Sequence, residues 1–368
     1  MQSKFRLLVV RLGAMGDILH ALPAVTALRL AHPGWQMDWV VEPAWAPLLT
    51  TGSEAGRRVQ RGPAQPIVDA IHPASVKAWG RSPLSAKTIR EIKYLRQNLR
   101  AGGYDAVLDF QGAIRSAFIG RLAGCQRVIG EAKPREQAAK WLFTERVETR
   151  GVHVIEQDLE VASAVAGDAL QPMLPLLPVD PEAETWCDAL LGAGMDHAPA
   201  RSVVLLNPGA GWGAKRWPVE RYAAVAQGLA ERGFSVVVNA GPGETELAQA
   251  IREQSSGAAL PAACTLSQLI ALTRRVSLAI AGDTGPLHLA CALGKPVIGI
   301  FGPTDPARNG PFGARGWARF RVLRSAESRR DHTRRAEPEA GLLTIQPGDV
   351  LQAADELQAG VPDGEAVR

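Results

Sequence analysis

The sequence predicts an α/β protein of two domains, each with a parallel sheet covered by helices on both faces. Short, uninterrupted apolar runs, typical of buried parallel strands, alternate with amphipathic stretches of helical spacing. This alternation occurs twice, and a proline cluster at residues 171–182 separates the two series. The chain has 368 residues, which is enough for two domains of ordinary size.

The first series begins close to the N-terminus. Residues 5–10 (FRLLVV) are expected to form a buried strand, which a glycine-containing turn connects to a helix from about residue 18 to residue 31. A Pro-Gly pair ends this helix, and residues 37–42 (MDWVVE) form the next strand, which completes a βαβ unit. Further along, a helix is expected at residues 84–102 and a strand at residues 104–109.

The second series follows the proline cluster and repeats the same alternation. Its strands are expected at residues 202–210, 234–242, 276–283 and 295–303, and its helices at residues 217–233, 267–275 and 284–293. Strands that alternate with helices in this way indicate βαβ units and a parallel sheet.

These boundaries predict two Rossmann-like domains. We expect the first at residues 1–175 and the second at residues 176–345, with a C-terminal helix and tail at residues 346–368 that packs back toward the first domain. Because doubly wound sheets bind ligands beyond the carboxyl ends of their strands, we expect the functional site in a cleft between the two domains. The polar, Gly/Pro-rich residues 50–66 are expected to form a surface loop.

Composition favours a globular protein of a reducing compartment. Hydrophobic residues make up 46% and charged residues 21%, which argues against disorder. The four cysteines are far apart and form no CxxC pair, so a zinc knuckle or a redox motif is not expected. No apolar run approaches the ~20 residues of a spanning helix, and the run at residues 7–10 is too short for a signal peptide. We therefore expect a cytoplasmic protein whose membrane contact, if any, is peripheral.

Positive charge gathers in two stretches. Residues 77–100 contain seven basic residues and one acid, and residues 315–335 contain eight arginines and two acids. Such stretches suit an anionic partner, which could be a phosphate-rich substrate, a membrane surface or nucleic acid. A solvated helix face explains either stretch alone equally well.

The turn after the first strand carries a carboxylate. Its glycines, Gly13 and Gly16, have GxxG spacing instead of GxGxxG, which weakens a dinucleotide interpretation. Asp17 follows them at the expected helix start, where a carboxylate usually caps the helix. Its place at the carboxyl end of a strand allows another role, that of a general base toward a sugar hydroxyl. Both interpretations remain open from the residues alone.

The loop at the start of the second series suits a phosphate. It contains Asn207 and Gly209, and it leads to Lys215 shortly before an expected helix start at Pro218. Backbone amides and a lysine at such a position can bind a phosphate, although the Walker A spacing is absent. A lysine that simply faces solvent in a turn is the alternative.

A third turn concentrates polar groups of several kinds. A strand is expected to end at Ala281 and a helix to begin near Pro286, with Asp283 and Thr284 between them and His288 one turn on. Amides at a helix N-terminus and a threonine hydroxyl can bind a diphosphate. Asp283 could be only an N-cap, but the cluster exceeds what capping needs.

Two further features bear on how a nucleotide diphosphate could be bound. Glu244 follows Gly-Pro-Gly at the end of another expected strand and could accept hydrogen bonds from ribose hydroxyls. The chain contains no DxD triplet, the paired carboxylates that commonly hold a divalent cation on a diphosphate. Lys215 and helix-end amides would then have to neutralise the leaving group, and no metal or other cofactor is expected.

Four stretches together resemble the ADP-heptose:lipopolysaccharide heptosyltransferases, the glycosyltransferase family 9 group with the GT-B fold, and most of all its heptosyltransferase I branch. The stretches are residues 15–23 (MGDILHALP), 215–218 (KRWP), 282–288 (GDTGPLH) and 302–306 (GPTDP). The resemblance implies an inverting, metal-independent transfer of L-glycero-D-manno-heptose from ADP-heptose to a Kdo sugar of the lipid A inner core. Nucleic acid is not an implied partner.

The resemblance also implies roles for individual residues. Asp17 would be the base that deprotonates the acceptor hydroxyl, and Glu244 would bind the ribose. The diphosphate would be held by Lys215, Thr284 and Gly285, in a turn shaped by Asp283 and His288. Basic acceptor contacts would come from Lys77, Arg81, Arg115 and Arg135.

Three other functions are weighed against this one. A nicotinamide-dependent oxidoreductase needs a GxGxxG turn, which is absent, and an acid at the end of the second strand, which Glu42 partly supplies. A nucleotide-sugar 2-epimerase shares the two-domain fold and the donor chemistry, but residues 15–23 argue against it. A non-enzymatic nucleotide-binding module would give Asp17 no purpose opposite a diphosphate.

Overall fold

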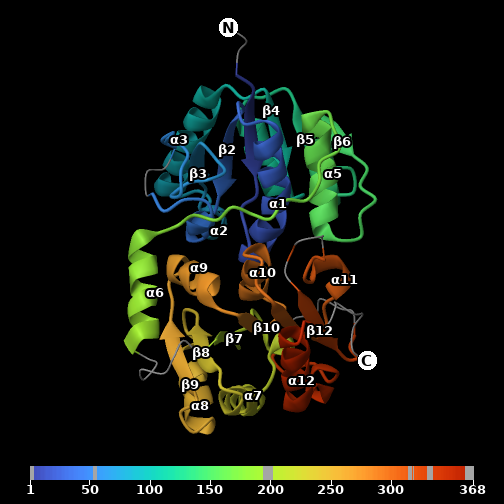
Figure 1. Cartoon of the computed structure of the whole chain (residues 1–368). Helices are drawn as coiled ribbons and strands as arrows, with labels where there is room; N and C mark the ends of the chain where they lie inside the picture. The colour runs from blue at the N-terminus through green and yellow to red at the C-terminus, as the bar shows by residue number, and fades with distance from the viewer. Residues whose placement is uncertain are drawn as a thin grey trace. The chain divides into compact units, whose positions relative to one another are not determined.

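The chain forms two compact units, Met1–Val179 and Asp180–Arg368, in a computed structural model (Figure 1). The structure describes residues 4–52, 56–193, 202–313, 317, 319–329 and 335–360. The boundary between the units lies four residues after the expected one at 175/176. Among the described residues, no helix has the length and apolar character needed to cross a membrane.

Each unit contains one parallel sheet with six strands in its described part. The strands of the first sheet, in the order β3-β2-β1-β4-β5-β6, are β1 (Arg6–Val10), β2 (Gln36–Val41), β3 (Ala70–Pro73), β4 (Ala106–Asp109), β5 (Val128–Glu131) and β6 (Glu145–Val147). The order reverses at β1, which pairs with β2 on one side and β4 on the other. Such a reversal is where doubly wound sheets bind ligands, beyond the carboxyl ends of the strands.

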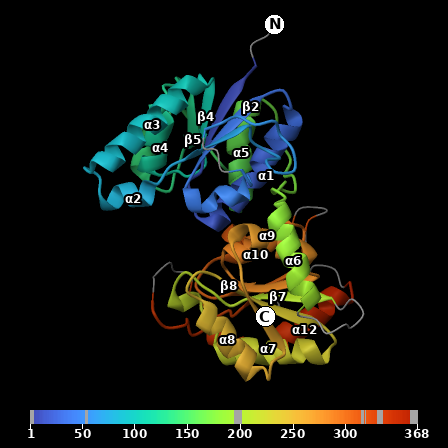
Figure 2. The same cartoon turned by 90° about the vertical axis from the view of Figure 1, so that its left-hand side faces the viewer.

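Helices cover both faces of the first sheet (Figure 2). The helices of this unit are α1 (Met15–Ala31), η1 (Pro43–Leu48), α2 (Val76–Arg81), α3 (Ala86–Gly102), α4 (Ile114–Leu122), η2 (Gln137–Trp141) and α5 (Val154–Ala166). On one face, Leu8 and Val10 share a buried cluster with Leu99 of α3 and Ala117 of α4. On the other, α1 packs against α5. The apolar residues of β1 are therefore buried on both sides of the sheet, as its uninterrupted apolar run predicts.

The second sheet has the same reversal. Its strands, in the order β12-β11-β10-β7-β8-β9, are β7 (Val203–Asn207), β8 (Ser235–Ala240), β9 (Ala259–Ala263), β10 (Leu278–Gly282), β11 (Val297–Phe301) and β12 (Phe320–Arg324). The helices of this unit are α6 (Pro181–Ala193), η3 (Gly213–Lys215), α7 (Val219–Glu231), α8 (Thr245–Gln254), α9 (Leu266–Arg275), α10 (Gly285–Ala292), α11 (Pro306–Asn309), η4 (Leu342–Thr344) and α12 (Pro347–Gln358).

The C-terminal helix α12 belongs to the second unit. We expected it to pack back toward the first domain, but its apolar side chains Val350, Ala353 and Leu357 lie in the core of the second sheet, together with residues of α7. Their i, i+3, i+7 spacing gives the helix one apolar face, which is buried against the second sheet beside α7. Residues 361–368 lie outside the described part of the chain.

The 50–66 segment forms no regular helix or strand in its described residues, 50–52 and 56–66, apart from one isolated bridge between Gly62 and Gln65. Most of residues 57–64 are exposed. The expected surface loop is therefore present in the part that the structure describes, while residues 53–55 lie outside it.

Candidate active site

Asp17 lies in the first turn of α1, just beyond the carboxyl end of β1. Its Oδ2 accepts a hydrogen bond from the amide of Ala14 at 2.9 Å, and its Oδ1 lies 3.3 Å from Nη2 of Arg11. The side chain of Asp17 is 38% exposed, whereas that of Arg11 is 8% exposed. Asp17 thus helps to cap the helix and still presents part of its carboxylate to solvent.

Arg11 is fixed by the ends of the neighbouring strands. Its Nη1 donates to the carbonyl of Phe110, and its own carbonyl accepts a hydrogen bond from Nε1 of Trp39 at 3.0 Å. The following amide, that of Leu12, donates to Oε1 of Gln111 at 3.1 Å. The first contact orders the guanidinium and the other two order the backbone at residues 11 and 12, so that the ion pair with Arg11 helps to position Asp17.

Two buried carboxyl groups accompany Asp17 in the first unit. Asp109 ends β4, where its Oδ1 accepts hydrogen bonds from the amides of Gln111 and Gly112 at 2.8 and 2.9 Å. Burial raises the pKa of Asp109 to about 6. Asp158 lies on α5, and burial raises its pKa to about 7, with the negative charge of Asp17 adding to the shift and Arg11 opposing it. Both groups are therefore poised to change protonation near neutral pH.

Sequence reasoning did not find Asp158. Its neighbours on α5 include the buried Leu159 and Val161, so an aspartate in this stretch is unusual for an apolar helix face. One of its oxygens, Oδ2, is buried without a hydrogen-bond partner among the described residues. An aspartate in an apolar helix face was the feature of the sequence that could have identified Asp158. Its proximity to Asp17 could not be predicted in this way, because it depends on the packing of α5 against α1.

In the second unit, the side chain of Asp283 contacts Lys215 and His288. It follows β10 and precedes α10, whose N-cap residue is Thr284. Lys215 Nζ makes an ion pair with Asp283 Oδ2 and lies 3.1 Å from its backbone carbonyl oxygen. His288 Nε2 lies 3.2 Å from Asp283 Oδ1. The exposed fractions of these three side chains are 11% or less, so the cluster is buried.

The electrostatics of this cluster keep Asp283 ionised. Burial alone would raise the pKa of Asp283, but the hydrogen bond from His288 and the positive charge of Lys215 outweigh it and hold that pKa well below its usual range. The ammonium of Lys215 also lies 4.4 Å from the ring centre of Trp212, a cation–π distance. Lys215 is thus held in one position beside the N-terminus of α10, where the helix dipole favours an anion.

Thr284 and Gly285 form the N-terminus of α10. The hydroxyl of Thr284 donates to the carbonyl of Gly282 at 3.3 Å and does not cap the helix. Pro286 occupies the first turn, where its missing N–H costs no intrahelical hydrogen bond. The structure therefore brings Lys215, Asp283, Thr284, Gly285 and His288 together, as the sequence predicts for a diphosphate site.

Glu244 lies at the same edge of the second sheet. It occupies the N-cap position of α8, and its Oε2 accepts a hydrogen bond from the amide of Gly241 at 3.0 Å. A Cβ atom placed on Gly209 would overlap the carboxylate of Glu244, so a larger residue at 209 would force the Glu244 side chain to shift. The loops after β7 and β8 therefore meet at Glu244.

Three buried polar side chains near this edge have atoms without hydrogen-bond partners among the described residues. They are Asn207 at the end of β7 (both Oδ1 and Nδ2), Asn239 near the end of β8 (Oδ1) and Thr304 after β11 (Oγ1). Because a buried polar atom without a partner costs ~1–3 kcal/mol, such atoms are candidates for ligand contact. Sequence reasoning placed Asn207 in the phosphate loop but gave neither asparagine a role.

The expected acceptor contacts all follow carboxyl ends of strands in the first sheet. Lys77 and Arg81 lie on α2 after β3, Arg115 lies on α4 after β4, and Arg135 follows β5. All four are exposed. The backbone amide of Arg135 lies against Gly112, so this residue and Arg115 flank the same turn. Lys77 and Arg81 lie at the other end of the strand order.

The arginine-rich stretch is not the continuous patch that its sequence suggests. Arg321 is 4% exposed and makes an ion pair with Glu356 of α12 at 3.0 Å, because it lies on strand β12 beneath this helix. Arg324 donates to the carbonyl of Ser328 at 2.9 Å. These two arginines stabilise the second unit, and Arg315, Arg330 and Arg334 lie outside the described residues.

No group of three or more His, Cys, Asp or Glu side chains in the described part of the chain is arranged to hold a metal ion.

Comparison with known proteins identifies the family. Residues 92–338 match the profile described as Glycosyltransferase family 9 (heptosyltransferase). Lipopolysaccharide heptosyltransferase 1 of Pseudomonas aeruginosa is 28% identical over 313 residues, which cover 84% of this chain and 81% of the relative. The enzyme of the same name from Escherichia coli K12 is 28% identical over 322 residues, covering 84% and 91%.

Solved structures agree. The E. coli heptosyltransferase WaaC with ADP is 25% identical and superposes with a TM-score of 0.74, covering 96% of this chain and 99% of that one. A family 9 glycosyltransferase from Veillonella parvula is 20% identical, with a TM-score of 0.77 and coverage of 98% and 99%, and shows the fold alone. The predicted α/β fold of GT-B type is confirmed, and so is the predicted enzyme class. The chain therefore belongs to glycosyltransferase family 9, the heptosyltransferase family.

Proposed function

We propose that the protein transfers L-glycero-D-manno-heptose from ADP-heptose to a Kdo sugar of the lipid A inner core, with inversion at the anomeric carbon. The observation that carries this proposal is the buried Lys215–Asp283–His288 cluster at the N-terminus of α10. It supplies a fixed positive charge and helix-end amides, which is what a departing diphosphate needs. The curated relatives named above are lipopolysaccharide heptosyltransferases, which supports heptose as the transferred sugar.

In the proposed reaction, the acceptor hydroxyl oxygen forms a bond to the anomeric carbon of the heptose. The bond from that carbon to the diphosphate oxygen breaks, and ADP leaves with the bonding electron pair. Asp17 takes the proton of the acceptor hydroxyl as this bond forms. Lys215 and the amides of Thr284 and Gly285 stabilise the negative charge on the leaving ADP.

Asp283 and His288 would act on the donor through Lys215. An ionised Asp283 holds the ammonium of Lys215 in place, and His288 holds the other oxygen of Asp283. Lys215 therefore meets the diphosphate without first having to be ordered, which lowers the entropic cost of binding. Glu244 would accept hydrogen bonds from the ribose hydroxyls, and Asn207, with both side-chain polar atoms unpartnered among the described residues, would contact the same ligand.

We also propose that the four exposed basic residues at the first sheet contact the acceptor, and that the protein works in the cytoplasm at the inner membrane surface. Lys77, Arg81, Arg115 and Arg135 share the carboxyl edge of the sheet with Asp17. This shared edge supports a common role toward an anionic acceptor.

A donor screen tests the proposed function. The purified protein is given a Kdo-bearing lipid A acceptor and either ADP-heptose, ADP-glucose, GDP-mannose or UDP-glucose, and the mass of the acceptor is measured before and after. We expect a mass gain of one heptose with ADP-heptose only. The Lys215→Gln variant should lose both turnover and ADP binding, whereas Arg252→Gln, which removes an exposed cation on α8, should behave like the wild type. Transfer of another sugar in preference to heptose would contradict the proposal.

A further inference from the structure

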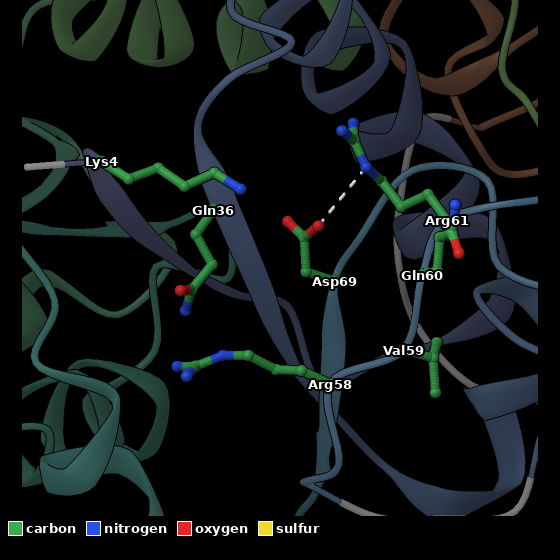
Figure 3. A pocket seen from close by; sticks show the side chains of 7 residues that line it. All are labelled: Lys4, Gln36, Arg58, Val59, Gln60, Arg61 and Asp69. Carbon is green, nitrogen blue, oxygen red and sulfur yellow. Dashed lines mark ion pairs between the residues drawn. The ribbon is translucent and has the colours of Figure 1, made fainter. Parts of the chain in front are cut away.

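The first unit has a cavity that the proposed reaction does not use. It has a volume of about 460 Å³ and lies at the amino-terminal ends of the strands, the opposite edge of the sheet from Asp17 (Figure 3). Lys4 precedes β1, Gln36 begins β2 and Asp69 directly precedes β3. Arg58 and Arg61, from the loop at 50–66, complete the charged part of the wall.

The carboxylate of Asp69 is already neutralised. Its Oδ2 accepts hydrogen bonds from Nη2 of the buried Arg29 at 2.7 Å and from the amide of Met37 at 2.8 Å. Its Oδ1 lies 3.4 Å from Nε of Arg61. Two guanidinium groups therefore share one carboxylate, and Asp69 leaves no negative charge in the cavity uncompensated.

A second carboxylate, that of Asp38, lies on β2 two residues after Gln36, and hydrogen bonds reach only one of its oxygens, because Oδ1 is buried without a partner among the described residues. Its Oδ2 accepts hydrogen bonds from the hydroxyl of Tyr104 at 2.8 Å and from Nε2 of Gln36 at 3.3 Å. Burial opposes its charge, but the nearby His72 side chain and the hydrogen bond from Tyr104 outweigh burial and lower its pKa. Nη2 of Arg58 lies 3.4 Å from the same oxygen, which uses one of the five donors of that guanidinium.

The cations of the cavity exceed its carboxylates. Among the residues that line the cavity, Lys4, Arg58 and Arg61 are cationic and Asp69 is the one carboxylate, which leaves a net charge of +2. Lys4 makes no ion pair with any described carboxylate, and the side chain of Arg58 is 45% exposed. Figure 3 shows these two side chains extending into the cavity on either side of Gln36. Their free donors surround one space.

We propose that this cavity binds a phosphate group, carried by a small metabolite or by a lipid headgroup. The volume lies in the range of small-molecule sites, about 300–1,000 Å³, but the charged lining disfavours an apolar ligand. A guanidinium, an ammonium and an amide N–H₂ around one space suit the oxygens of a phosphate monoester. Binding here would involve neither Asp17 nor the Lys215 cluster, which lie at other strand ends.

Calorimetric titration with inorganic phosphate and with glucose 6-phosphate tests the proposal, at constant ionic strength because exposed charges are screened by salt. We expect the Lys4→Gln/Arg58→Gln double variant to weaken binding by about tenfold or more, since charge-assisted hydrogen bonds are lost. Arg252→Gln, on the other unit, removes one exposed cation and should bind as the wild type does. The Lys215→Gln variant distinguishes binding at this cavity from binding at the donor site, because it should weaken only the latter and leave binding at Lys4 and Arg58 unchanged.

A vesicle arm distinguishes the two sources of phosphate. Cosedimentation with phosphatidylcholine vesicles containing phosphatidic acid, lost in the double variant, would assign the cavity to a lipid headgroup, whereas calorimetric binding without cosedimentation would assign it to a soluble phosphate. If the double variant destabilises the fold, Lys4→Gln alone is used, because Lys4 is exposed and makes no ion pair with a described carboxylate. The proposal is overturned if the wild type and the Lys4 variants bind every probe with equal affinity.

Discussion

Replacing Asp158 by asparagine should change how the stability of the first unit depends on pH. The carboxyl group of Asp158 has a pKa raised by burial to about 7, against an ordinary value of 3.8. The folded state therefore holds this proton more tightly than the unfolded state does. Between about pH 4 and pH 7 the unfolded chain has lost this proton and the folded protein still holds it. The contribution of Asp158 to the free energy of unfolding therefore falls as the pH rises through this range and is level above it.

The structure sets the size of this effect. A difference of about three pH units corresponds to about 4 kcal/mol, and partial relaxation around a buried charge makes roughly 2–4 kcal/mol the expected range. Asparagine has the shape of the protonated acid and no charge to bury. We therefore expect the free energy of unfolding of Asp158→Asn, relative to the wild type, to increase by roughly 2–4 kcal/mol between pH 4.5 and pH 8.

Urea unfolding at several pH values, followed by tryptophan fluorescence, measures this difference. Asp109, whose pKa is also raised, is present in both proteins, so its contribution cancels. The exposed Asp168 provides the control, because Asp168→Asn should show no such growth with pH. The buried amide that the Asp158→Asn substitution introduces does not titrate. Any cost of burying it therefore changes the free energy of unfolding by the same amount at every pH. A stability difference that stays constant from pH 4.5 to pH 8 would refute the reasoning.

Three further predictions concern activity. Asp17→Asn should lower turnover by ~10²–10⁴ and leave donor affinity nearly unchanged, as single-turnover kinetics and calorimetry would show; near-wild-type turnover would end the catalytic assignment. Turnover should persist in excess chelator, because Lys215 and helix-end amides are expected to neutralise the diphosphate, and activity that required added magnesium or manganese would contradict this. Neutralising Arg90, Lys93 and Arg96, exposed at i, i+3 spacing on α3, should raise the KM for the acceptor and reduce its salt dependence while sparing donor affinity; unchanged acceptor kinetics at low salt would leave only a solvated helix face.

The sequence predicted best where a strand, a turn and a helix follow one another closely. The segment around Asp283 is the clearest case, because an apolar run ends at a Gly-Asp-Thr-Gly turn and proline marks the helix start. The observed β10 and α10 follow these signals to within about two residues. Short strands such as β5 and β6, with four and three residues, were not predicted, because so few residues cannot establish a period.

Long-range packing explains what the sequence did not reveal. The apolar spacing of α12 predicts a buried face but does not say which sheet buries it. Arg321 reads as one cation of a basic stretch, yet it lies at 4% exposure beneath Glu356 because β12 carries it under α12. The same holds for Asp158, whose raised pKa comes chiefly from its burial where α5 packs against α1. In each case the deciding neighbour is far away along the chain.

Asp17 shows why a structural role and a catalytic role need not exclude each other. The sequence offered them as alternatives, a helix cap or a general base. In the structure, Oδ2 accepts the amide of Ala14 and Oδ1 pairs with Arg11, which satisfies the structural role. An ionised carboxylate, however, has about four acceptor positions on its two oxygens, and these contacts use two of them. Because the side chain is also 38% exposed, the remaining positions can receive the proton of an acceptor hydroxyl while the two structural contacts keep the carboxylate aimed. In the proposed reaction, the capping contact would therefore aim the base and would not compete with it.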